Sequence, residues 1–92
     1  MKKNEGNEIL IIKKVFGMTA QEKRLKSKIT QERLSEMIGI TDVYLRCIES
    51  GKNVPNWITW LKLCTALGVD IFEIQQKYIE PCLRVDLNIS DF

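Results

Sequence analysis

Apolar side chains recur at helical spacing in two short stretches on either side of Gly39. Leu34 and either Met37 or Ile38 share one face of the first stretch, and Leu45 and Ile48 share one face of the second. Only a few residues separate the two stretches, and Gly39 is suited to the positive φ that ends a helix. The pattern therefore predicts two short helices joined by a tight turn between residues 30 and 51.

Polar residues suited to helix capping precede both predicted helices. Thr30 caps a helix over residues 31–38, and Thr41 or Asp42 caps a helix that ends at Gly51. Ile40 is predicted to enter the core where the chain reverses. Two helices with such a short connection form a helix-turn-helix, whose second helix is shaped for the major groove of DNA.

The next helix is marked by a strongly periodic apolar face. It is predicted to begin after the cap Asn56, to run from Trp57 to Leu67 and to end at Gly68. Trp57 and Trp60 lie at helical spacing, which favours core packing or a dimer contact over a stacking platform for single-stranded nucleic acid.

The C-terminal part of the chain predicts one more helix and a strand. Asp70 and Glu73 form a capping box that opens a helix to about Ile79, and Pro81 ends this helix. Residues 83–89 then alternate strictly between apolar and polar side chains, which predicts a β-strand.

The N-terminal stretch over residues 8–16 is rich in β-branched side chains, which favours a strand over residues 8–14. A helix is the alternative, because Ile9, Ile12 and Phe16 also share a helical face. Gly17 is predicted to interrupt this pattern.

Thr19 and Glu22 form a capping box that opens a first helix from about Ala20 to Lys28.

The elements together predict an all-α core of five helices flanked by short terminal β-strands. Because a lone strand leaves its backbone unpaired, residues 8–14 are expected to pair with residues 83–89, within one chain or across a dimer; extended tails are the alternative. The predicted domains are an N-terminal arm over residues 1–18, a helix-turn-helix domain over residues 19–80 and a C-terminal tail over residues 81–92.

The charge distribution changes this picture modestly. The 92 residues, 45% of them hydrophobic, suffice for one small domain with a formal net charge of +2. Residues 1–52 carry eleven Lys and Arg against seven acids, whereas residues 53–92 carry three against five. A basic half that holds the motif favours a polyanionic partner, although a solvated surface of mixed charge explains the charge alone equally well.

Candidate chemistry is sparse. The chain has no histidine, and its three cysteines, Cys47, Cys64 and Cys82, are widely spaced. This excludes Ser-His-Asp and Cys-His catalysis and signals neither a disulfide framework nor a zinc site. We therefore predict no enzyme, no cofactor, no metal and no small-molecule ligand. We also predict no membrane span, and reduced thiols in a cytoplasmic protein.

The segment TQERLSEMIGITDVYLRCIESGKNVPNWITWLKLCTALGVDIFEI resembles the Cro/repressor-like (Xre-type) helix-turn-helix family. The resemblance rests on Thr30-Gln31, Ser35, Gly39-Ile40, Leu45, Ile48-Glu49, Gly51-Lys52, Pro55 and the stretch LCTALGV. It implies a five-helix, lambda-repressor-like domain that binds DNA, and it does not extend to the terminal strands.

The resemblance also implies roles for single residues. Arg24 and Glu49 match a structural ion pair between the first and third helices. The residues that match phosphate contacts are Gln31, Ser50, Lys52 and Asn53. The base-reading face of the third helix is expected to comprise Thr41, Asp42, Val43, Tyr44, Arg46 and Cys47.

Arg46 is the best single reader on this face, because a guanidinium binds guanine O6 and N7 with two hydrogen bonds. Val43 suits contact with a thymine methyl group. Asp42 has three readings: it accepts from a cytosine amino group, pairs with Arg46 four residues later, or stabilises the helix N-terminus as an acid. Cys47 is more readily a small spacer than a redox switch.

The favoured function is a sequence-specific, double-stranded-DNA-binding transcriptional regulator, a repressor or auto-regulator of bacterial, phage or mobile-element type. A homodimer would place two third helices in successive major grooves of an inverted repeat. The alternative is a protein-interaction module on the same fold, such as an antitoxin-like or anti-repressor protein with a protein partner.

Overall fold

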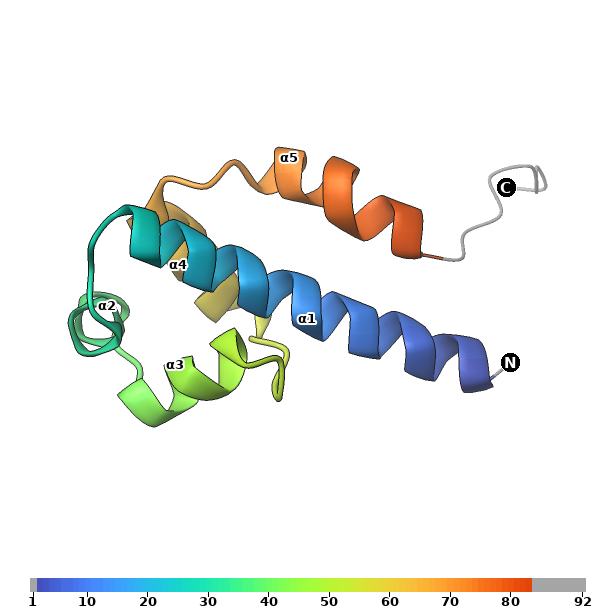
Figure 1. Cartoon of the computed structure of the whole chain (residues 1–92), viewed down its shortest axis with the longest axis horizontal. Coiled ribbons are helices and arrows are strands. Elements are labelled where there is room, and N and C mark those ends of the chain that lie inside the picture. Colours follow the sequence, from blue (N-terminus) through green and yellow to red (C-terminus); the bar gives the residue numbers. More distant parts are fainter. Residues whose placement is uncertain (1, 84–92) are drawn as a thin grey trace.

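The computed structural model describes the backbone of residues 2–83 and the side chains of residues 7–83. Over this range the chain is helical and contains no strand. A long first helix crosses the whole molecule, two short helices pack on one side of it, and the C-terminal segment runs back along it (Figure 1). The helices are α1 (Lys2–Lys26), α2 (Gln31–Ile38), α3 (Asp42–Glu49), α4 (Trp57–Leu67) and α5 (Ile71–Ile74). A π-helical turn (Gln75–Ile79) and a 3-10 turn (Glu80–Cys82) continue α5.

The prediction of an N-terminal strand is wrong, because residues 8–14 belong to α1. The predicted capping box is wrong as well, since Thr19 and Glu22 lie inside the same helix. The helical alternative holds because tertiary packing overrides β-propensity: Phe16 stacks on Trp60 of α4, with ring centroids 4.3 Å apart. The proposed pairing of two terminal strands is therefore excluded. The predicted C-terminal strand lies outside the described residues, except for Leu83, whose backbone is extended.

The predicted helix-turn-helix is confirmed together with its caps. The Thr30 hydroxyl accepts from the Arg33 amide at 3.0 Å, and the Thr41 hydroxyl accepts from the Tyr44 amide at 3.0 Å. Gly39 ends α2 at a φ of 77° and donates its amide to the Ser35 carbonyl. Half-buried Ile40 packs against the core, as predicted.

One contiguous core joins all five helices. Its fully buried members come from α2, α3 and α4 and are joined by Ile74 of α5. Trp60 lies inside this core at 4% exposure, as predicted, whereas Trp57 is 63% exposed and does not contribute to it. The buried cluster comprises Leu34, Ile38, Leu45, Ile48, Trp60, Leu63, Cys64 and Ile74.

Gly17 is a contact point between α1 and the end of α3. A Cβ atom on Gly17 would lie 2.5 Å from the Ile48 carbonyl oxygen and 2.7 Å from the Glu49 carbonyl oxygen. Only a residue without a side chain allows the two backbones to approach this closely. The glycine that was predicted to interrupt the N-terminal pattern therefore continues α1 and docks it on α3.

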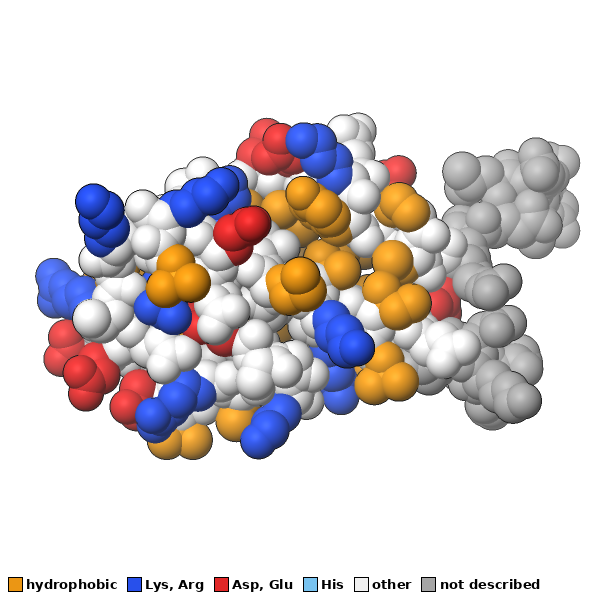
Figure 2. All heavy atoms as spheres, in the orientation of Figure 1, with side chains coloured by type: hydrophobic (Ala, Val, Ile, Leu, Met, Phe, Trp, Pro, Cys, Tyr) orange, Lys and Arg blue, Asp and Glu red, His pale blue; other side chains and the backbone are white. Residues whose placement is uncertain are grey.

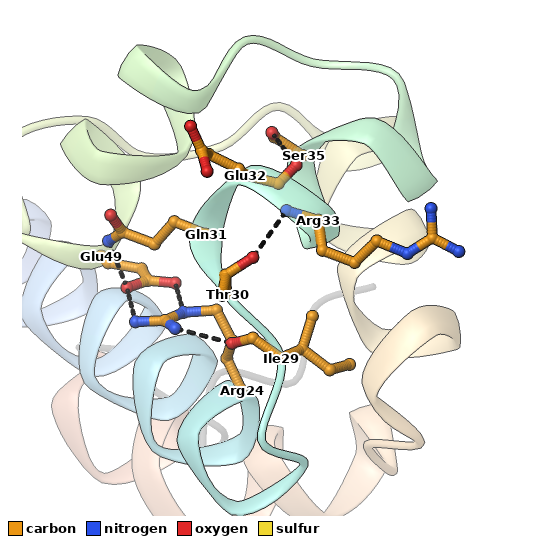
Figure 3. A network of polar contacts seen from close by, with 8 residues as sticks. All are labelled: Arg24, Ile29, Thr30, Gln31, Glu32, Arg33, Ser35 and Glu49. Carbon is orange, nitrogen blue, oxygen red and sulfur yellow. Dashed lines mark hydrogen bonds and ion pairs between the residues drawn. The ribbon is translucent and has the colours of Figure 1, made fainter.

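A buried ion pair joins the same two helices, as the resemblance implied (Figure 3). Arg24 Nε donates to Glu49 Oε2 at 2.7 Å, and Arg24 Nη2 donates to Glu49 Oε1 at 3.1 Å. Arg24 Nη1 also donates to the Ile29 carbonyl, and Gln31 Nε2 donates to Glu49 Oε1 at 2.9 Å. One carboxylate thus fixes α1, α2 and α3 relative to one another.

Replacing Gly17 with alanine should destabilise the protein. Alanine favours a helix by about 1 kcal/mol, but crowding two carbonyl oxygens costs about 1–3 kcal/mol, so urea unfolding should give a net loss of stability. Met18→Ala is the matched control, because Met18 is 68% exposed on the same helix and should change little. A Gly17→Ala variant as stable as the wild type would contradict this close packing.

Replacing Glu49 with leucine should cost about 3–5 kcal/mol, because Arg24 would keep its charge in a buried position without a partner. The double variant Arg24→Met, Glu49→Leu should recover much of this loss, since no buried charge remains. Both variants can be compared by urea unfolding followed by circular dichroism. A double variant no more stable than the single one would show that the cost has another source.

Candidate nucleic-acid interface

One side of α3 is buried and the other is exposed to solvent. Leu45, Ile48 and Glu49 are buried against the rest of the fold, whereas Val43 is 59% exposed and Arg46 is exposed. The expected base-reading residues therefore fall on the exposed side of the helix, with one exception. Thr41 is exposed and Asp42 and Cys47 are half-buried, whereas Tyr44 is half-buried and packs against the core.

Asp42 and Arg46 are brought together as their spacing predicted. Arg46 Nη2 lies 3.5 Å from Asp42 Oδ2, and the two side chains remain open to solvent, Arg46 more than Asp42. A pair of this kind on a helix surface contributes only about 0.3–0.5 kcal/mol. Asp42 is also the first residue of α3, where the helix dipole favours a negative charge, so its position has a structural explanation as well.

The four expected phosphate contacts lie on two segments. Gln31 opens α2, and one of its amide hydrogens is engaged by Glu49. Its amide group has a second hydrogen, which can be donated to a further acceptor. Ser50, Lys52 and Asn53 are exposed in the segment after α3, where the Ser50 hydroxyl donates to the Cys47 carbonyl at 3.2 Å.

The segment after α3 is a well-defined turn. Gly51 has a φ of 81°, and the amides of Lys52 and Asn53 both donate to the Cys47 carbonyl, at 2.9 and 3.3 Å. α1 passes directly behind this turn, because a Cβ atom on Gly51 would lie 3.7 Å from Lys14 Cα. The turn therefore presents the exposed Lys52 beside a basic part of α1.

Acidic side chains gather at the opposite end of this surface. A polar hollow of about 490 Å³ between α2 and the start of α3 is lined by Glu32, Glu36 and Asp42, together with Arg33. Arg33 Nη1 lies 3.7 Å from Glu36 Oε1, which offsets part of this charge. Figure 2 shows several red side chains at the α2 end of the molecule, with blue side chains beside them. Away from these acids, Lys52 lies in the turn after α3, beside Lys13 and Lys14 of α1.

The remaining candidate chemistry lies apart from this surface. All three cysteines are free thiols, and burial raises the pKa of Cys64 to about 11, so this thiol is inert. A hydrogen bond from Lys77 to Glu73 raises the pKa of Lys77. Within residues 2–83, no cluster of His, Cys, Asp or Glu is suited to a metal ion, and no helix is long and apolar enough to cross a membrane.

The sequence did not predict that Lys13 and Lys14 belong to α1, because these two residues were placed on a strand. A usable signal was present in the spacing. Lys14, Gly17 and Arg24 recur at steps of three and seven residues, which puts them on one helical face. Since Arg24 was expected to face Glu49, Lys14 could have been placed beside the end of α3.

Comparisons with known proteins agree with this geometry. The family model described as Helix-turn-helix matches residues 21–74, more than half of the chain. A Bacillus subtilis (strain 168) protein named "Uncharacterized HTH-type transcriptional regulator YgzD" is 32% identical over 60 residues, which cover 62% of this chain and 91% of that protein. The match confirms the resemblance that the motif carried. The chain belongs to the helix-turn-helix family of the Cro/repressor-like (Xre) type.

Proposed function

We propose that the chain is a sequence-specific, double-stranded-DNA-binding transcriptional regulator of the repressor or auto-regulator type. The observation that carries the proposal is the exposed face of α3, where Val43 and Arg46 project from a helix whose other face is held by the core and by Glu49. An α-helix with its side chains is about 10–12 Å in diameter, which fits a major groove that is about 12 Å wide. The name of the B. subtilis relative supports the same class of function.

In this proposal base contacts and backbone contacts have separate tasks. Arg46 binds a guanine and Val43 contacts a thymine methyl group, which supplies sequence discrimination. Thr41, Asp42 and Cys47 border these two readers, and Tyr44 contributes through its ring edge. The backbone is contacted by Gln31, Ser50, Lys52 and Asn53, which fix the register of α3 without reading sequence.

We further propose that the protein binds an inverted repeat as a homodimer. Two copies of α3 must then lie about 34 Å apart, one turn of the double helix. The exposed apolar residues at the start of α4, Val54, Trp57 and Ile58, follow the turn after α3 directly in the chain. A contact between two copies at this point keeps both α3 helices close to the two-fold axis. Exposed tryptophan is also typical of interface centres.

A protein-interaction module remains the second candidate, because one groove of the domain is apolar. Met37, Ile58, Leu61 and Ala66 line a groove of about 660 Å³ between α2 and α4. An amphipathic helix of a partner protein is the kind of ligand that binds in such a groove. This candidate predicts binding that does not depend on the charge of α3 and of the turn after it.

Replacing Arg46 with alanine should lower the affinity for the cognate operator by roughly 5- to 150-fold, the equivalent of about 1–3 kcal/mol. Lys52→Ala should instead weaken binding to all duplexes alike and reduce the slope of log K against log salt by about 1. Both effects can be measured by fluorescence anisotropy on DNA from upstream of the gene and on a random duplex.

The matched control is Lys62→Ala, which removes an exposed positive charge from α4 in the α2/α4 groove. This variant should bind both duplexes like the wild type. Unchanged DNA affinity in Arg46→Ala and Lys52→Ala would rule out the proposed groove contact and favour the protein-interaction module.

The dimer can be tested with two exposed apolar residues on different surfaces. Trp57→Ala should yield a monomer by light scattering, with little loss of stability, because Trp57 lies outside the core. Met18→Glu, on the exposed side of α1, should remain a dimer. A dimeric Trp57→Ala protein together with a monomeric Met18→Glu protein would move the interface to α1.

A further inference from the structure

We infer that the N-terminal half of α1 extends the DNA-binding surface, with Lys14 as a contact to the DNA backbone beside Lys52. The inference rests on the proposed function and names a further binding residue for it. Nothing in the helix-turn-helix itself provides this residue, because the family match begins at residue 21, after Lys14.

The position of Lys14 is fixed by two glycines. Gly17 brings the backbone of α1 against the Ile48 and Glu49 carbonyls, and one turn earlier in α1 the Lys14 backbone lies against Gly51. A Cβ atom on Gly51 would be 3.7 Å from Lys14 Cα and 3.8 Å from Lys14 Cγ. A side chain at Gly17 would push α1 away from α3, whereas the distances at Gly51 are ordinary van der Waals contacts that place Lys14 directly beside the turn.

The side chains at this junction are available to a ligand. Lys14 and Lys52 are exposed, whereas the neighbouring Lys13 is half-buried. None of these three lysines belongs to an ion pair with another side chain of residues 7–83. Two lysines on adjacent segments therefore lie near the end of α3 without an ion-pair partner among residues 7–83.

Phosphate is the ligand chemistry that this junction fits. α2 carries the exposed Glu32 and Glu36, and α3 begins with the half-buried Asp42; these acids repel a DNA backbone. Lys52, in the turn after α3, and Lys14, on the adjacent part of α1, attract it instead. A duplex that receives α3 in its major groove would meet Lys52 and Lys14 on the same flanking strand.

A purely structural role for Lys14 predicts a different result. The ammonium group would then stabilise the negative C-terminal end of the α3 dipole, an effect on folding rather than on binding. The two roles are separated by the salt dependence of DNA binding, because only a phosphate contact releases counterions.

The experiment compares Lys14→Gln with Lys62→Gln, binding each variant to a short random-sequence duplex at increasing concentrations of potassium chloride. We expect Lys14→Gln to lower affinity about three- to ten-fold and to reduce the slope of log K against log salt by about 1. Lys62→Gln should match the wild type. Thermal unfolding of both variants should show melting temperatures close to that of the wild type.

The inference would be overturned if Lys14→Gln kept the wild-type slope of log K against log salt. It would also be overturned if this variant melted at a lower temperature while its salt slope stayed that of the wild type. If Arg46→Ala still loses operator affinity in that case, the proposed function stands without the α1 contact. If the wild-type protein shows no salt-dependent binding to any duplex, the proposed function and the inference fail together.

Discussion

The orientation of α3 depends on one buried carboxylate. Glu49 accepts hydrogen bonds from Arg24 of α1 and Gln31 of α2, and Arg24 uses its remaining nitrogen for the Ile29 carbonyl. Burying two charges is costly, and this cost is offset only when every donor and acceptor is satisfied. That condition holds here, since no buried side-chain nitrogen or oxygen of the described residues lacks a partner. A satisfied network of this kind permits one arrangement of the three helices and penalises others.

Gly17 and Gly51 add a steric constraint to this polar one. Gly17 allows the backbone of α1 to approach that of α3, and Gly51 takes the positive φ that the turn after α3 requires. Arg24 fixes α3 two turns further along α1, so the two helices are held at separate points. For this reason α1 contacts the helix-turn-helix as far back as Lys13 and Lys14.

The parts of the fold that the sequence predicted correctly are those with local signals. Thr30, Thr41, Asn56 and Asp70 all cap the helices that follow them, because a capping bond needs only a side-chain oxygen and an amide two or three residues later. The N-terminal half of α1 was predicted wrongly because its evidence is not local. Its helical state depends on the contact between Phe16 and Trp60, which lie far apart in the chain.

In the candidate site too, the features with local signals were predicted, and a distant contact was predicted only where the family resemblance supplied it. The Asp42–Arg46 pair follows from a spacing of four residues, and the Arg24–Glu49 pair followed from the family resemblance. The sequence did not predict that Lys14 lies beside Lys52, because a strand at residues 8–14 would have no predictable position relative to Gly51. Placing Lys14 required the knowledge that α1 is continuous through Gly17.

In the proposed complex Arg46 would exchange its ion pair with Asp42 for a contact with guanine. Both side chains are open to solvent and 3.5 Å apart, so separating them costs only about 0.3–0.5 kcal/mol. A bidentate contact between Arg46 and guanine contributes about 1–3 kcal/mol of discrimination, which exceeds that cost. Asp42 keeps its stabilising place at the N-terminus of α3 when Arg46 leaves it. The ion pair with Asp42 is therefore too weak to prevent the guanine contact that we propose for Arg46.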